Sequence, residues 1–84
     1  MSYTTIFLRE LVKQFRRLPK KIKLRIRHRI IELSDNPYLG LRLVGDLTGF
    51  WKDRIGKYRI VYKIDENKKT VIFYDVDLRK RVYE

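Results

Sequence analysis

The sequence predicts an α+β fold in the order β-α-α-β-β-β, with a two-helix hairpin packed on a small, mainly antiparallel twisted sheet. Three observations predict this fold. Apolar residues recur at helical spacing from Leu8 to Leu33, with one interruption at Pro19. The residues around Gly56-Lys57 alternate between two faces, as hairpin strands do. An apolar run follows at residues 71–74, as in a central strand covered on both faces.

The first half of the chain is expected to hold one strand and two helices. Tyr3 to Leu8 is rich in β-branched and aromatic residues, which favours a strand. The first helix follows and should end at Pro19, which is also accepted in the first turn of a second helix. That helix should end at Ser34-Asp35-Asn36-Pro37. The apolar positions of the two helices are Leu8, Leu11, Val12, Phe15 and Leu18, then Ile22, Ile26, Ile30 and Leu33.

The second half is expected to supply the rest of the sheet. Residues 38–49 indicate a loop with short strand character at Leu41 to Val44. Strands are predicted at Phe50–Ile55, Tyr58–Ile64 and Thr70–Val76, with a turn at residues 65–69 between the last two. The chain has 84 residues, which is enough for one domain, residues 1–84, around one core.

The glycine-first turn at Gly56-Lys57 fixes the register of the hairpin, because a two-residue loop leaves no freedom of pairing. Counting outward pairs Arg54 with Arg59 and places Asp53 on the apolar face, where a register error or an edge position would account for it. The full set of pairs is Ile55 with Tyr58, Arg54 with Arg59, Asp53 with Ile60, Lys52 with Val61 and Trp51 with Tyr62.

One face of this hairpin therefore carries Lys52, Arg54 and Arg59 together. Like charges directly across a strand pair, such as Arg54 and Arg59, destabilise the fold by roughly 0.2–1 kcal/mol, so folding does not explain their presence. Binding of a polyanion would explain the cluster. The alternative is that edge charges prevent sheet aggregation. On the opposite face, Trp51 and Tyr58 are expected to be core residues.

The net charge of +11 and the pI near 10.2 favour a phosphate-rich or acidic partner. From Arg9 to Arg29 there are ten Lys or Arg residues and a single acid, Glu10. A charge run of this kind is either a solvated helix face or a binding surface.

The composition excludes several kinds of chemistry. There is no cysteine and one histidine, His28, so thiol nucleophiles and His or Cys metal sites lack their parts. His28 is expected to be a solvated surface residue. No phosphate-binding glycine motif is present, and no apolar run is long enough for a membrane span or a signal peptide. A cytoplasmic protein without metal or cofactor is expected.

Two motifs carry a resemblance to a known family. Gly56-Lys-Tyr-Arg-Ile-Val-Tyr62 follows the pattern G-x-Y-R-hydrophobic-hydrophobic-Y, and Arg79-Lys-Arg-Val-Tyr83 follows a closing R-x-x-V-Y. With the expected order of elements and the basic helical hairpin, the chain resembles the RelE/ParE superfamily of toxins from bacterial and archaeal toxin–antitoxin pairs, and more closely its RelE branch.

The resemblance implies a messenger-RNA endonuclease that works in the ribosomal A site without metal or cofactor. A ribose 2′-hydroxyl attacks the adjacent phosphorus and leaves a cyclic phosphate and a 5′-hydroxyl. The implied partners are the ribosome with its mRNA and a cognate antitoxin protein. The residues that match the family's catalytic set are Lys52, Arg54, Arg59, Arg79 and Tyr83. The basic residues expected to bind RNA and the ribosome are Lys13, Arg16, Arg17, Lys20, Lys21, Lys23 and Arg27.

The chemistry of these residue types suits the reaction. Cations around Lys52 favour its neutral amine, the form that accepts a proton, and Arg54 would assist and bind phosphate. Arg59 and Arg79 would stabilise charge on the phosphorane, and Tyr83 would stack on a base or assist proton transfer. Many relatives carry histidine before the terminal arginine; this chain has Leu78. The alternatives are a ParE-like inhibitor of DNA gyrase and a non-enzymatic nucleic-acid binder.

Overall fold

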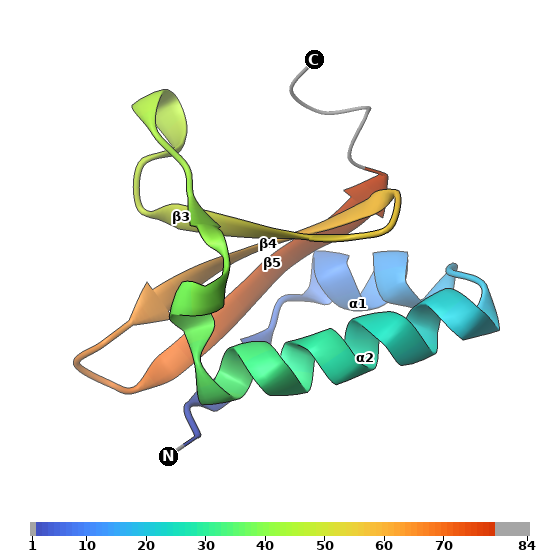
Figure 1. Cartoon of the computed structure of the whole chain (residues 1–84), viewed down its shortest axis with the longest axis horizontal. Helices are drawn as coiled ribbons and strands as arrows, with labels where there is room; N and C mark the ends of the chain where they lie inside the picture. Colours follow the sequence, from blue (N-terminus) through green and yellow to red (C-terminus); the bar gives the residue numbers. More distant parts are fainter. Residues whose placement is uncertain (1, 79–84) are drawn as a thin grey trace.

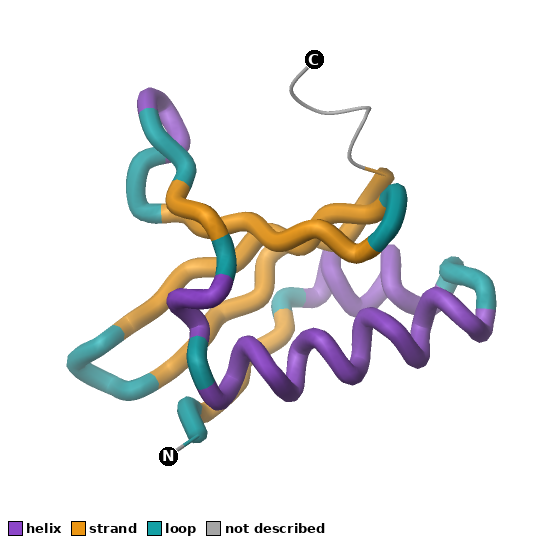
Figure 2. Tube along the Cα trace, in the orientation of Figure 1, coloured by secondary structure: helices purple, strands orange, loops and turns teal. Residues whose placement is uncertain are grey.

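The computed structural model describes residues 2–78 and confirms the predicted order of elements (Figures 1 and 2). The two helices are α1 (Arg9–Arg16) and α2 (Lys20–Asp35). The strands are β1 (Thr4–Phe7), β2 (Leu41–Arg42), β3 (Phe50–Ile55), β4 (Tyr58–Asp65) and β5 (Thr70–Leu78). Short 3-10 turns at Pro37–Leu39 and Gly45–Leu47 flank β2. The predicted strand character at residues 41–44 is therefore real but covers two residues.

The sheet has the strand order β1-β5-β4-β3-β2. Strand β1 runs parallel to β5, and the other three pairs are antiparallel. Both helices lie on the same face of the sheet, so the molecule has two layers (Figure 1). None of the helices in residues 2–78 is long and apolar enough to cross a membrane.

The core lies between the helices and one face of the sheet. Pro19 stands just before α2 and separates it from α1, as the sequence predicts. From the helices, Leu11, Ile26 and Leu33 are buried. The sheet contributes the buried apolar residues Ile55, Ile60, Tyr62, Val71, Phe73 and Val76. Trp51 and Tyr58 pack against this cluster, which confirms their predicted place in the core.

Strand β5 contains a bulge that the sequence did not reveal. Tyr62 pairs with Phe73 and Val61 pairs with Asp75, so Tyr74 is one extra residue in β5. Phe73 and Val76 therefore both face the helices. The central position predicted for residues 71–74 is confirmed, because β5 lies between β1 and β4. The helices cover only one face of this strand, and Ile72 and Tyr74 are half-buried on the other.

Candidate functional site

The β3–β4 hairpin has the register that the sequence predicts, pair for pair, from Trp51–Tyr62 to Ile55–Tyr58. Because Ile60 and Tyr62 face the helices, Lys52, Arg54 and Arg59 belong to the other face of the sheet. We call this side the open face. It includes Phe50, Lys52 and Arg54 of β3, Arg59, Val61 and Lys63 of β4, and Ile72, Tyr74, Asp75 and Asp77 of β5.

Lys52 and Arg54 are the available cations of the predicted catalytic set. Lys52 is half-buried and Arg54 is exposed. Within residues 2–78, no acidic side chain forms an ion pair with either of them. The structure therefore brings two cations with unused hydrogen-bond donors to one surface, two residues apart on one strand.

Arg59 lies on the same face but in a different environment. It is only 3% exposed, and its Nη2 lies 3.5 Å from Oδ2 of Asp75. Asp77 stands directly across from Arg59 in the β4–β5 register. The bulge at Tyr74 is what turns Asp75 toward this face. Arg59 is thus a buried, paired cation beside Lys52 and Arg54. The two other predicted catalytic residues, Arg79 and Tyr83, lie outside the described residues.

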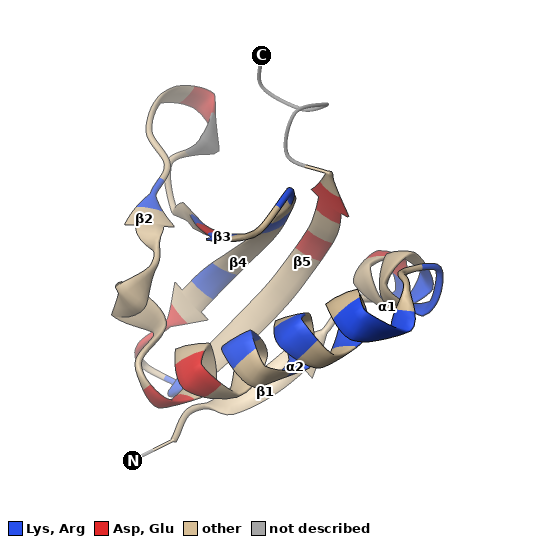
Figure 3. Cartoon of the chain, turned by 45° about the vertical axis from the view of Figure 1, so that its right-hand side comes forward, with Lys and Arg blue, Asp and Glu red and all other residues tan. Residues whose placement is uncertain are grey.

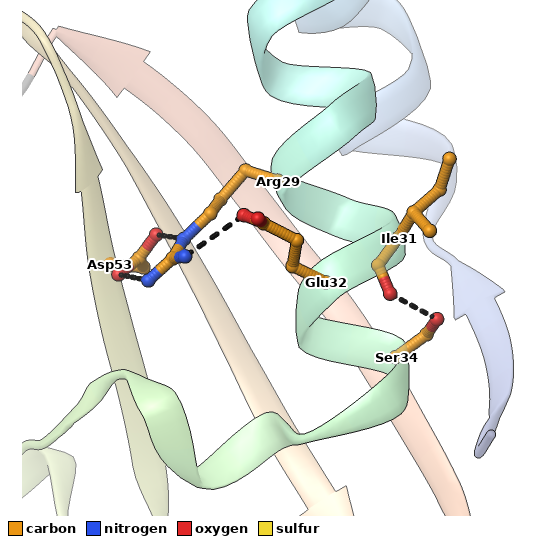
Figure 4. Close-up of polar contacts among 5 residues, drawn as sticks. All are labelled: Arg29, Ile31, Glu32, Ser34 and Asp53. Atoms are coloured by element: carbon orange, nitrogen blue, oxygen red, sulfur yellow. Dashed lines mark hydrogen bonds and ion pairs between the residues drawn. The ribbon is translucent and has the colours of Figure 1, made fainter. Parts of the chain in front are cut away.

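The unexplained Asp53 has a partner on α2 (Figure 4). Arg29 donates from Nε to Asp53 Oδ2 at 2.5 Å and from Nη2 to Oδ1 at 3.0 Å, and from Nη1 to Glu32 at 3.0 Å. These hydrogen bonds, those to Asp53 above all, raise the pKa of Arg29 above its ordinary value. Asp53 stands between Lys52 and Arg54, so the pair ties β3 to the helix layer.

A second contact supports β3 from the β2 side. The buried Tyr62 donates its hydroxyl to the Pro37 carbonyl oxygen at 2.6 Å. Burial raises the pKa of Tyr62 to about 12, so this hydroxyl keeps its proton. Gly40 lies where a methyl group would approach the Lys52 carbonyl oxygen to 2.6 Å. The segment before β2 is therefore packed tightly behind Lys52.

Aromatic rings border the cations on the open face. Phe50 and Tyr74 meet edge to face with centroids 5.0 Å apart, and Lys63 Nζ lies 4.6 Å from the Phe50 centroid. The sequence analysis missed this group. Its signal was the parity of Phe50 and Lys63, which places both with Lys52.

The basic residues expected to bind RNA lie in the helix layer, on the opposite side of the sheet (Figure 3). All are exposed except Lys23, which is half-buried. Lys23 and Arg27 lie over the ring of Phe15, at 6.0 and 5.8 Å from its centroid. The chain therefore presents two basic surfaces rather than one. We call the second the basic helical surface, made of Lys13, Arg16, Arg17, Lys20, Lys21, Lys23 and Arg27.

The open face has the chemistry to hold a phosphodiester. Guanidinium and ammonium groups bind phosphate oxygens and stabilise charge that develops on them. The single histidine, His28, is exposed on α2, as predicted. Among residues 2–78, no three His, Asp or Glu side chains form a group that could hold a metal ion.

The chain matches known proteins over nearly its whole length. A model of the family described as the ParE toxin of type II toxin-antitoxin system, parDE, matches residues 1–83. Toxin RelG of Mycobacterium tuberculosis is 32% identical over 99% of this chain and 98% of its own length. RelE4 of Methanocaldococcus jannaschii is 36% identical over 88% of this chain and 79% of its own length. The crystal structure of the toxin–antitoxin complex RelBE2 from M. tuberculosis contains a chain with 31% identity and a TM-score of 0.87, covering 94% of this chain and 93% of that one.

Proposed function

Because the chain belongs to the ParE toxin family of type II toxin–antitoxin systems, within the RelE/ParE superfamily, we propose that it is a toxin that cuts mRNA in the ribosomal A site. One observation carries the proposal. Lys52 and Arg54 stand side by side on the open face without acidic partners in residues 2–78, next to a third cation, Arg59. Folding gains nothing from the positive charges of Lys52 and Arg54 at these positions, whereas a bound phosphodiester would be stabilised by them.

The proposed reaction is an internal transfer at phosphorus. The neutral amine of Lys52 takes the proton of a ribose 2′-hydroxyl, and the 2′-oxygen forms a bond to the adjacent phosphorus. The bond from phosphorus to the 5′-oxygen breaks, and that oxygen takes up a proton. The products are a 2′,3′-cyclic phosphate and a 5′-hydroxyl.

The two described arginines have different roles in this proposal. Arg54 is exposed and supplies the guanidinium that contacts the phosphate. Arg59 is buried against Asp75, so it supplies a fixed positive charge beneath the reacting group. Arg79 and Tyr83 are proposed to complete the set, Arg79 at the phosphorane oxygens and Tyr83 at a base or in proton transfer.

We also propose a cognate antitoxin as the partner that silences the toxin. The similar M. tuberculosis toxin is held in a toxin–antitoxin complex. A net charge of +11 suits an acidic segment that covers one or both basic surfaces. The ribosome and its mRNA are the proposed targets of the free toxin.

Primer extension on an mRNA incubated with purified protein tests the proposal. We expect new 5′ ends within codons only when translating ribosomes are present. Because the matching family carries the ParE name, a supercoiling assay with DNA gyrase runs in parallel. Inhibition of gyrase with no mRNA cleavage would show that the protein is a gyrase inhibitor and would refute the nuclease proposal.

A further inference from the structure

A polar groove lies between α2 and the β3–β4 turn, with a volume of about 390 Å³. Four side chains of α2 line one wall, namely Arg25, His28, Arg29 and Glu32, and residues 54–56 line the other. The groove lies beyond the end of β2, which pairs only with Trp51 and Lys52, so the edge of β3 next to the groove is not covered by another strand. Neither predicted basic set includes Arg25 or His28.

The charges in this groove do not cancel. Arg29 is engaged by Asp53 and Glu32. Glu32 is the only acid among the described residues that line the groove. Arg25 and Arg54 have no acidic partner within residues 2–78. His28 is three residues after Arg25, so both lie on the same side of α2. The groove therefore holds the guanidinium group of Arg25 and an imidazole, and a second arginine without an acidic partner, Arg54, stands at its edge.

The Arg25 guanidinium is close to the backbone of the β3–β4 turn. A methyl group at Gly56 would lie 3.2 Å from Arg25 Nη1, and Gly56 has a φ of +60°. The positive φ favours glycine at this position, and the absence of a side chain leaves space beside the end of Arg25. The end of the Arg25 side chain therefore lies beside the turn residues that line the groove.

We propose that this groove binds a backbone phosphate of RNA through Arg25, His28 and Arg54. The identification of RNA as the polyanion rests on the proposed function. Arg54 joins the two sites, because its register places its side chain on the open face and the same residue borders the groove. A strand whose scissile phosphate lies at Lys52 and Arg54 would continue around the edge of β3 to Arg25. Planar guanidinium groups match phosphate oxygens two at a time.

An acidic protein segment fits this groove less well than RNA does. Helices that dock in grooves use several apolar anchors along one face. Among residues 2–78, Ile55 is the only large apolar residue that lines it. A groove suited to such anchors lies elsewhere on the described chain, lined by Phe7, Leu11, Phe15, Ile30 and Ile31 among others.

Binding of an RNA that cannot be cleaved tests the groove separately from the nuclease. A 2′-O-methyl oligonucleotide lacks the attacking hydroxyl, so its affinity does not depend on catalysis. We expect Arg25→Gln to weaken binding about tenfold and to reduce the slope of log K against log salt by about 0.7. Lys68→Gln is the matched control, because Lys68 is exposed on the β4–β5 turn, at the other end of β4. Equal effects of the two substitutions would overturn the proposal.

His28 gives a second readout in the unmodified protein. It is the only histidine, so its imidazole signals in an NMR spectrum need no assignment by mutation. We expect the oligonucleotide to shift these signals in the wild type and in Lys68→Gln, and much less in Arg25→Gln. Signals that move with an acidic peptide but not with the oligonucleotide would overturn the proposal in favour of a protein ligand. If the wild-type protein gives both expected binding results but does not cleave mRNA, the nuclease proposal is refuted and the groove proposal stands.

Discussion

Arg29 of α2 and Asp53 of β3 form a two-point ion pair across the layers of the fold, at 2.5 and 3.0 Å. Asp53 is the residue between Lys52 and Arg54, and its side chain is only 11% exposed. A carboxylate this well covered needs a cation to offset its desolvation. The pair therefore fixes β3 to α2 at the point where Lys52 and Arg54 project from the open face.

Arg29→Met should destabilise the protein more than Asp53→Leu does. The first change leaves a nearly buried carboxylate without its partner, at a cost of about 3 kcal/mol. The second leaves Arg29, which is 29% exposed and keeps Glu32. The double variant should lose less than the sum of the two. Urea unfolding measures all three, with Arg25→Met as an exposed control on the same helix. Additive losses would show that the two side chains do not interact.

The fold was predictable because local signals agreed with one another. The apolar spacing of α2, the stop at Pro19 and the two-residue turn at Gly56 each point to one structure. The bulge at Tyr74 was not predictable, because residues 71–74 are apolar throughout and carry no alternation that an extra residue would disturb. It is a product of packing, since it lets Phe73 and Val76 both enter the core.

Part of the candidate site was predictable for the same reason. The turn fixes the register, and the register places Lys52, Arg54 and Arg59 on one face. Contacts between distant segments were not predictable from one sequence. Asp53 on an apolar face was the signal that a cation from the helix layer was needed, but several basic residues of α2 were candidates. The pairing of Arg59 with Asp75 depends on the bulge and was hidden with it.

Lys52→Ala should abolish most of the cleavage while leaving binding largely intact. Removal of a general base costs about 10²–10⁴-fold in rate. The measurement is single-turnover cleavage of mRNA on saturating ribosomes. Lys57→Ala is the control, since Lys57 is exposed in the same hairpin but lies in the turn. A Lys52→Ala rate within twofold of wild type would remove Lys52 from the mechanism.

Asp75→Asn should make the protein less stable and bind RNA more tightly. The buried Arg59 loses the charge of one carboxylate partner, which costs about 1–3 kcal/mol. The open face gains one unit of positive charge, so RNA affinity should rise and depend more steeply on salt. Urea unfolding and RNA titrations at several salt concentrations measure the two effects. Asp46→Asn makes the same charge change at an exposed position in the Gly45–Leu47 turn. If both variants bind RNA alike, the effect is one of net charge and not of the open face.

Gly40→Ala should displace β2 and the segment before it, which packs behind Lys52. The added methyl group would meet the Tyr62 hydroxyl and would lie 2.6 Å from the Lys52 carbonyl oxygen. Neither neighbour can move far, because Tyr62 is fully buried and Lys52 is held in the sheet. We expect a loss of about 2–3 kcal/mol in unfolding free energy. Tyr62→Phe removes one of the two contacts, so it should recover part of this loss in the double variant. A fully stable Gly40→Ala protein would show that the segment before β2 adapts freely.

Glu66→Gln should remove part of the acid sensitivity of the fold. Hydrogen bonds from Lys69, Tyr3 and Tyr38 lower the pKa of Glu66 to about 2, from an ordinary value of 4.5. A carboxyl group whose pKa is lower in the folded state stabilises the fold fully above its unfolded pKa. The stabilisation is lost as pH falls toward the folded pKa. The gap in unfolding free energy between wild type and Glu66→Gln should therefore be constant near neutral pH and shrink between about pH 4.5 and pH 2. Tyr38→Phe removes one of the hydrogen-bond donors to Glu66. The gap in unfolding free energy between Tyr38→Phe and Glu66→Gln should therefore shrink less with acid than the gap between wild type and Glu66→Gln. A gap that stays constant down to pH 2 would mean that these hydrogen bonds do not distinguish the charged from the neutral carboxyl group.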